Sequence, residues 1–236
     1  MTIDQTTTVA EIASALPASV RLFQRHGIDF CCGGKTPLAT VCQQKGIPFA
    51  DVTRALDALP TGPAGDDRDW TREPLARLAD HIVATYHDAL RDELPRLEGM
   101  AVKVAKVHGA RAPHLVRLAS VVQELSADLH AHMQKEEGVL FPAIRALERG
   151  AARGSIAAPI AVMEHEHDSA GAALARMREL TGDYEPPMDA CNTFRASLDG
   201  LAELERDTHQ HVHKENNVLF PRALEQEVAL QPPARG

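Results

Sequence analysis

Two segments of the chain carry nearly the same pattern of histidine, glutamate and apolar residues. Residues 132–142 read HMQKEEGVLFP and residues 211–221 read HVHKENNVLFP. In each segment a His is followed four residues later by a Glu, and residues four apart lie on one face of a helix. An imidazole and a carboxylate that point inward from one helix are metal ligands, so each segment offers half of a dinuclear site.

An internal repeat extends this pattern to the helices that precede the two segments. A shift of 79 or 80 residues superimposes the two halves of residues 71–225, so that each half supplies a lone His and a His-x-x-x-Glu. One His on an apolar stripe is usually a core residue, but six ionisable residues related by a repeat favour a metal site, because burial without a partner is costly. The predicted metal ligands are His87, His132, Glu136, His167, His211 and Glu215.

The donor set limits the identity of the metal. Four imidazoles and two carboxylates, without thiolate, suit iron, manganese or zinc and do not suit a structural zinc ribbon. Two metals that share two Glu bridges would each hold about two His, with room for an oxo or hydroxo bridge and an open position. We expect two iron ions, because this geometry supports redox chemistry with dioxygen, peroxide or nitric oxide.

Other histidines compete for the same role. Two of them precede a ligand Glu by six residues, which places them about 240° around the helix from it. His108 lies in a connection rich in Gly and Ala, either near the mouth of the site or exposed to solvent. The histidines interpreted as surface groups or neighbours of the ligands are His81, His130, His165, His209 and His213.

The N-terminal part contains two adjacent cysteines, Cys31 and Cys32, followed by two glycines that permit a tight turn. A disulfide between neighbouring cysteines would be strained and easily reduced. Lys35 and a following helix would favour the thiolate, so we interpret the pair as a thiol site that ligates or passes iron or responds to oxidants. The alternative is two small buried residues without chemistry. Cys42 and Cys191 are interpreted as core residues.

The chain is expected to be all-α, with a small N-terminal helical domain and an up-down-up-down four-helix bundle. The expected domains are residues 1–59 and 71–228, joined by a Pro/Gly linker over 60–70. Three short helices are expected in the first domain, starting near Ser19, Pro37 and Phe49. The bundle helices are expected over 72–98, 113–148, 155–180 and 187–228, and Pro95, Pro142 and Pro221 should end or kink them.

Charge and composition exclude several classes of function. A net charge of −8 argues against nucleic-acid binding. No segment resembles a secretion signal, and no apolar run is long enough to cross a membrane. Four cysteines without a framework spacing fit the reducing cytoplasm.

Over essentially its whole length the chain resembles the bacterial repair-of-iron-centres proteins, in which a short Cys-Cys-Gly-Gly domain precedes a hemerythrin-like di-iron domain. The matching segments are DFCCGGKTPLA, ATYHDALRDELP, HMQKEEGVLFP, VMEHEHDSAG and HKENNVLFPRAL. The resemblance places the family's iron ligands on the six residues chosen above, its cysteine pair on Cys31 and Cys32, and a loop histidine on His108. The additional histidine of oxygen-carrying hemerythrins is not evident, which argues against reversible oxygen transport.

The resemblance implies a di-iron protein that repairs iron–sulfur clusters after oxidative or nitrosative stress, by supplying iron. Its expected partners are damaged iron–sulfur proteins and small ligands such as nitric oxide or dioxygen, and a homodimer is plausible. The alternatives are a di-iron nitric oxide reductase or peroxidase, and an oxygen or nitric oxide sensor, so the residues leave open whether the protein is an enzyme.

Overall fold

The computed structural model describes residues 3–59, 68–151 and 154–230. Every regular element among these residues is helical, and one isolated bridge joins Thr8 to Pro37. The all-α prediction is therefore confirmed. The chain divides into two compact units, one of residues 1–78 with 209–236 and the other of residues 79–208, and each is described by itself. The expected linker falls mainly on residues 60–67, which lie outside the described residues, so the expected domain boundary stays a prediction.

The first unit begins with short helices around a small apolar core. Thr8 and Glu11 form a capping box at the start of the first helix, which the sequence analysis missed. The three helices that follow were expected, and they start close to the predicted residues Ser19, Pro37 and Phe49. Phe23, Phe30 and Leu38 are almost completely buried between these elements. The helices are α1 (Val9–Ala15), α2 (Ser19–Arg25), α3 (Leu38–Lys45) and α4 (Phe49–Asp57).

The same unit contains the C-terminal end of the chain. There a π-helical turn, η3 (Glu215–Leu219), leads directly into α11 (Phe220–Leu230). The guanidinium group of Arg222 donates hydrogen bonds to the carbonyl oxygens of Trp70, at 2.8 Å, and Glu73, at 2.7 Å. These bonds hold the start of α11 against the segment that leads into the long helices.

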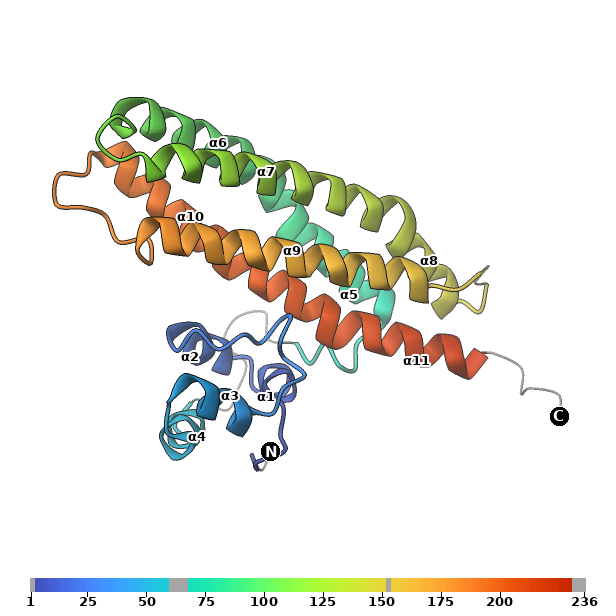
Figure 1. Ribbon diagram of the computed structural model, residues 1–236. Coiled ribbons are helices and arrows are strands. Elements are labelled where there is room, and N and C mark those ends of the chain that lie inside the picture. The colour runs from blue at the N-terminus through green and yellow to red at the C-terminus, as the bar shows by residue number, and fades with distance from the viewer. Residues whose placement is uncertain (1–2, 60–67, 152–153, 231–236) are drawn as a thin grey trace. The chain divides into compact units, whose positions relative to one another are not determined.

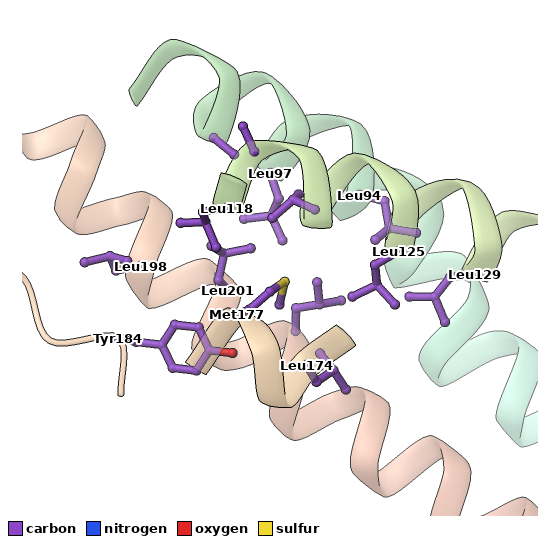
Figure 2. Packing of buried hydrophobic residues seen from close by; sticks show 14 of the residues in the cluster. Leu94, Leu97, Leu118, Leu125, Leu129, Leu174, Met177, Tyr184, Leu198 and Leu201 are labelled. Carbon is purple, nitrogen blue, oxygen red and sulfur yellow. The ribbon is translucent and has the colours of Figure 1, made fainter. Parts of the chain in front are cut away.

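The long helices follow one another as four helical runs along the described residues, as predicted. In the second unit α6, α7, α9 and α10 lie side by side (Figure 1). Their inner faces form a core of leucines, with Leu94, Leu125 and Leu201 no more than 2 % exposed (Figure 2). The runs are α5 (Leu75–Ile82), η1 (Val83–His87) and α6 (Asp88–His108); α7 (His114–Lys135), η2 (Glu136–Leu140) and α8 (Phe141–Glu148); α9 (Ala157–Thr181); and α10 (Asn192–Lys214), which continues into η3.

The expected end of the first long helix near residue 98 was wrong. Pro95 lies inside α6, which continues to His108. Proline removes the bond to the carbonyl of Arg91, but both residues lie on the exposed side of the helix. Water can bind that carbonyl, so the helix continues past the proline. No helix among the described residues is long and apolar enough to span a bilayer.

The leucine core predicts a clear contrast between two substitutions on α9. Leu174 is 1 % exposed, so Leu174→Ala should lower the free energy of unfolding by about 2–5 kcal/mol, because it leaves a cavity. Val162 on the same helix is 50 % exposed, and Val162→Ala should change the free energy of unfolding by less than about 0.5 kcal/mol. Chemical denaturation measures both, and equal losses would contradict the assignment of the buried face.

Candidate metal centre

Three of the predicted ligands lie at the ends of π-helical turns. His87 ends η1, Glu136 begins η2 and Glu215 begins η3. In each turn a backbone N–H bonds to the carbonyl five residues back, as Phe141 does to Glu136. Such wide turns occur often at functional sites, where they redirect a side chain.

The Phe-Pro pairs of the two repeated segments account for two of these turns. Pro142 is the second residue after η2, and Pro221 is the second residue after η3. Because proline has no N–H, the regular ladder of the α-helix would be broken there in any case, so rearrangement to a wider turn costs little. The prolines therefore neither end nor sharply interrupt the helical runs, and their effect is the local change of winding.

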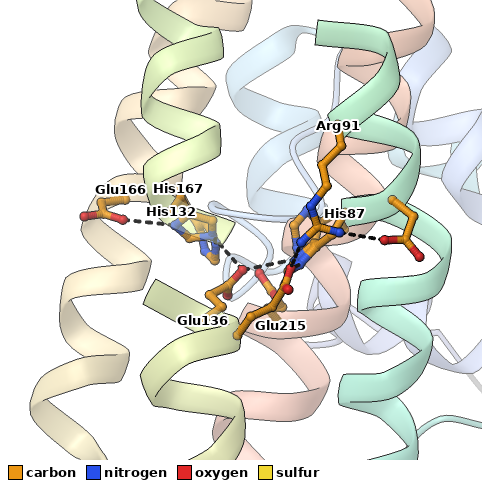
Figure 3. A network of polar contacts seen from close by, with 10 residues as sticks. His87, Arg91, His132, Glu136, Glu166, His167 and Glu215 are labelled. Carbon is orange, nitrogen blue, oxygen red and sulfur yellow. Dashed lines mark hydrogen bonds and ion pairs between the residues drawn. The ribbon is translucent and has the colours of Figure 1, made fainter. Parts of the chain in front are cut away.

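The second unit brings four predicted ligands together. One oxygen of Glu136, Oε2, lies 3.3 Å from Nε2 of His87 and 3.2 Å from Nε2 of His132. The Nε2 atoms of His132 and His167 are 3.1 Å apart. All four residues are no more than 3 % exposed, and their side chains point toward one another from three helical runs (Figure 3).

Two outer carboxylates determine which ring nitrogens point inward as acceptors. Glu137 Oε1 lies 2.7 Å from Nδ1 of His87, and Glu166 Oε2 lies 3.0 Å from Nδ1 of His132. An ionised carboxylate only accepts hydrogen bonds, so both Nδ1 atoms carry the proton. The Nε2 lone pairs of both rings are therefore directed at Glu136, as in metal sites where a carboxylate orients a histidine ligand.

Surface cations support the two outer carboxylates. Arg91 binds Glu137, and Lys135 binds Glu166. Burial alone would raise the pKa of each carboxyl, but the hydrogen bonds from the histidine and the cation outweigh it and lower the pKa. Both groups are therefore ionised at neutral pH and able to hold the imidazoles. The sequence analysis missed Glu137 and Glu166, although each directly neighbours a predicted ligand in the sequence.

The remaining two predicted ligands form a pair at the end of α10. Nε2 of His211 lies 3.0 Å from Oε1 of Glu215, and both side chains are no more than 1 % exposed. The potential ligand atoms form two overlapping groups, each within 4.8 Å, and both groups contain Glu136 and Glu215. The first group adds His87 and His211, and the second adds His132 and His167.

This donor set fits a pair of cations. Unprotonated ring nitrogens and carboxylate oxygens are all acceptors, and acceptors that converge in a buried space repel one another. Metal ions shared through the two carboxylates would reverse this repulsion, and nitrogen and oxygen donors suit iron. The buried His/Glu group therefore fits a di-iron site.

Two of the other histidines have clear contacts of their own. Nδ1 of His130 lies 2.8 Å from the carbonyl oxygen of Ser126 on its own helix. His213 is not a surface group, because its ring is buried and bonded to the backbone of Phe30. Burial lowers the pKa of His213 to about 4. His108 lies near Cys191, with Nε2 and Sγ 3.7 Å apart.

The environment of Cys31 differs from the expectation of a thiolate. The Cys31 and Cys32 sulfurs lie 3.8 Å apart and form no disulfide, and Cys31 Sγ donates to Oδ1 of Asp29 at 3.3 Å. The contact with Cys32, burial and the Asp29 carboxylate raise the pKa of the Cys31 thiol. Cys42 is buried as expected, whereas Cys191 is exposed and its assignment to the core was wrong.

Comparisons with known proteins agree with this fold and site. The family model of the hemerythrin HHE cation binding domain matches residues 78–223, and the ScdA_N domain, described as of unknown function, matches residues 5–60. Together they define a hemerythrin-like helical protein with an additional N-terminal domain.

Relatives narrow this class further. The chain is 42% identical over 217 residues to "Iron-sulfur cluster repair protein YtfE" of Pectobacterium atrosepticum, covering 92% of this chain and 96% of the relative. It is 42% identical over 214 residues to the protein of the same name from Yersinia pseudotuberculosis, covering 90% and 94%. The chain belongs to this family of hemerythrin-like proteins, and the resemblance seen in its motifs is confirmed.

The raised pKa predicts slow alkylation of Cys31. Because only the thiolate reacts, Cys31 should react with iodoacetamide at least about tenfold more slowly than exposed Cys191 at pH 8. Asp29→Asn keeps a hydrogen-bond acceptor but removes the negative charge, so it should accelerate the reaction. Mass spectrometry of timed samples measures each rate, and equal rates at Cys31 and Cys191 would contradict the environment described above.

Proposed function

We propose that the six converging residues hold two iron ions joined by an oxo or hydroxo bridge. Glu136 and Glu215 would serve both ions, because they are the members common to both ligand groups. His87 and His211 would hold one ion, and His132 and His167 would hold the other. Two irons held in this way supply redox chemistry and open positions for small ligands such as nitric oxide or dioxygen.

The protein's own residues prepare this site before metal binds. Glu137 and Glu166 keep His87 and His132 in the tautomer whose free nitrogen faces inward. The ring of Phe141 lies against the ring of His87, with centroids 5.8 Å apart, and limits its rotation. The apolar surroundings limit the access of water, which would otherwise compete for the metal.

We propose that this centre serves the repair of iron–sulfur clusters damaged by oxidative or nitrosative stress, with iron supplied by the protein as cargo. The observation that carries the proposal is the buried group of four imidazoles and two carboxylates, in a chain whose relatives are named iron–sulfur cluster repair proteins. Cys31 and Cys32 take part in the transfer of iron to the damaged protein. The partners are thus iron–sulfur proteins.

We propose a cytoplasmic location on the basis of the thiols. Four free cysteines fit a reducing compartment, which supports a cytoplasmic location. A homodimer stays a prediction of the sequence.

The ligand assignment predicts a contrast between two neighbouring histidines on α7. His132→Ala removes a donor that faces Glu136 and should reduce iron from two ions per chain to about one or fewer. His130→Ala, two residues away, removes only a contact with Ser126 and should retain both ions. Elemental analysis of anaerobically loaded, refolded variants measures this, and loss of iron in both variants alike would contradict the assignment.

The repair function predicts recovery of a damaged enzyme. A dehydratase whose [4Fe–4S] cluster has been oxidised by peroxide to [3Fe–4S]+, with the peroxide then removed, should regain activity when incubated without oxygen with the protein loaded with ferrous iron and a one-electron reductant. One Fe2+ from the protein and one electron from the reductant restore [4Fe–4S]2+. Nitric oxide removal cannot explain recovery in this assay. His132→Ala should fail because it lacks iron, and Cys31→Ala with Cys32→Ala should retain iron but lose the recovery.

Two results would count against the proposal. Recovery with His132→Ala equal to that with the wild type would show that the centre is not needed. Full recovery with the double cysteine variant would remove the role assigned to the thiols.

A further inference from the structure

Two side chains in the first unit connect the turn that carries Glu215 with the loop that carries Cys31. His213 and Asn217 lie two residues before and two residues after Glu215. Nδ1 of His213 lies 3.0 Å from the carbonyl oxygen of Phe30. The Asn217 amide donates to the carbonyl oxygens of Cys31, at 2.9 Å, and Phe30, at 3.3 Å. We call these contacts the carbonyl clamp.

The clamp is buried and directional. His213 is 6 % exposed, and because a carbonyl can only accept, its Nδ1 must carry the proton and donate to Phe30. Its other nitrogen lies 3.5 Å from the hydroxyl oxygen of Ser14, which can donate to it. The Phe30 ring also lies edge-on to the His213 ring, with centroids 5.6 Å apart. Breaking the clamp would therefore leave buried polar groups without partners, unless the loop moved to reach water.

The cysteine loop is built around one conformation on its other side. The Asp29 carboxylate accepts backbone hydrogen bonds from Cys31, Cys32 and Gly33, at 2.9 to 3.0 Å. A Cβ at Gly34 would lie 2.6 Å from the carbonyl oxygen of Phe30, so glycine is required for this close approach. Asp29 holds the N–H groups of the loop while the clamp holds its carbonyls, and together they keep Cys31 only 4 % exposed.

The turn that carries Asn217 is also the turn that carries Glu215. Both residues belong to η3, and the N–H of Phe220 closes this turn on the carbonyl of Glu215. Glu215 and Asn217 therefore share one short turn of backbone, so a change in the winding of η3 shifts both side chains. Such a shift would alter the hydrogen bond between Asn217 and the carbonyl of Cys31.

We propose that His213 and Asn217 are positioning residues that couple metal occupancy at Glu215 to the exposure of Cys31. With metal bound, η3 is fixed, the clamp is closed and the sulfur is shielded. When the metal leaves, η3 loosens, the clamp opens and Cys31 becomes accessible to solvent and to other proteins. This inference rests on the proposed metal site, and it adds a signal by which the cysteine loop responds to the loss of iron.

The buried sulfur agrees with this order of events. In the clamped loop the Cys31 thiol keeps its proton and donates a hydrogen bond to Asp29, and its pKa is raised, so it is a poor ligand and nucleophile. A thiol that must accept iron or contact a partner has to leave this environment. Release of the two carbonyls frees the peptide units on both sides of the residue.

The experiment measures alkylation of Cys31 in protein loaded with ferrous iron and in the same protein after chelation, both without oxygen. Short pulses of N-ethylmaleimide followed by peptide mass spectrometry give the rate at each cysteine, with exposed Cys191 as the internal reference. In the wild type, iron removal should accelerate Cys31 by about fivefold or more, the effect of losing roughly one net hydrogen bond. Elemental analysis of the same samples gives the iron content.

Variants of the clamp sharpen the test. Asn217→Ala should make Cys31 react rapidly with iron bound, at the rate of the iron-free wild type, while iron content stays at the wild-type level. Asn217→Asp, of nearly equal shape but without an N–H to donate, should do the same and replaces Asn217→Ala if circular dichroism shows that it is unfolded. Gln226→Ala, nine residues further along the same helical run, should behave as the wild type.

The outcomes separate this inference from the proposed function. If the wild type holds two irons but Cys31 reacts equally fast with and without them, the coupling is overturned and the metal site stands. If Asn217→Ala and Asn217→Asp both keep Cys31 shielded, the clamp is overturned as its cause. If the wild type binds no iron, the proposed function fails, and the coupling fails with it.

Discussion

The burial of two carboxylates among four imidazoles is the constraint on which the rest of the structure depends. Glu136 and Glu215 are fully buried, and an ionised carboxylate in such a place is stable only when positive charge or donors surround it. The helices must therefore hold the six ligands in positions where cations can bind between them. The π-helical turns, the prolines that follow them and the outer ion pairs all contribute to these positions.

The support of the ligands extends outward in two parallel chains of contacts. On one side Arg91 holds Glu137, which orients His87, and on the other a lysine, a glutamate and His132 repeat this order. Each series of contacts runs from a solvated cation to a buried acceptor. The charges that orient the site therefore stay near water, where their desolvation costs little free energy. The interior then holds only groups that the metal itself can satisfy. Loss of an outer residue would thus be felt at the metal without any change in its ligands.

The repeat made the fold class and the six-residue group predictable, because helical periodicity and donor type act locally along the chain. The supporting carboxylates were not predictable in this way, since Glu166 contacts His132 across two helices and resembles any surface glutamate in the sequence. The protonated state of Cys31 depends on Asp29 and on burial, whereas charge counting along the chain pointed to Lys35 and a thiolate. Pro95 did not end its helix as predicted. The cost of a proline inside a helix depends on whether water can reach the unpaired carbonyl, and that exposure is a property of the folded helix.

The wide turns at the ligands bear on how such a site is inherited. A π-helical turn holds one residue more than the α-helix can take in the same rise, as if a single residue had been inserted beside each of His87, Glu136 and Glu215. Deletion of one codon in such a turn would restore an ordinary helix and rotate the ligand away from its partners, while the leucine core would keep its own packing. A form of this fold that binds metal and a form that does not would therefore differ by the deletion of a single codon. A bundle without the metal site could thus arise from this one in very few mutations.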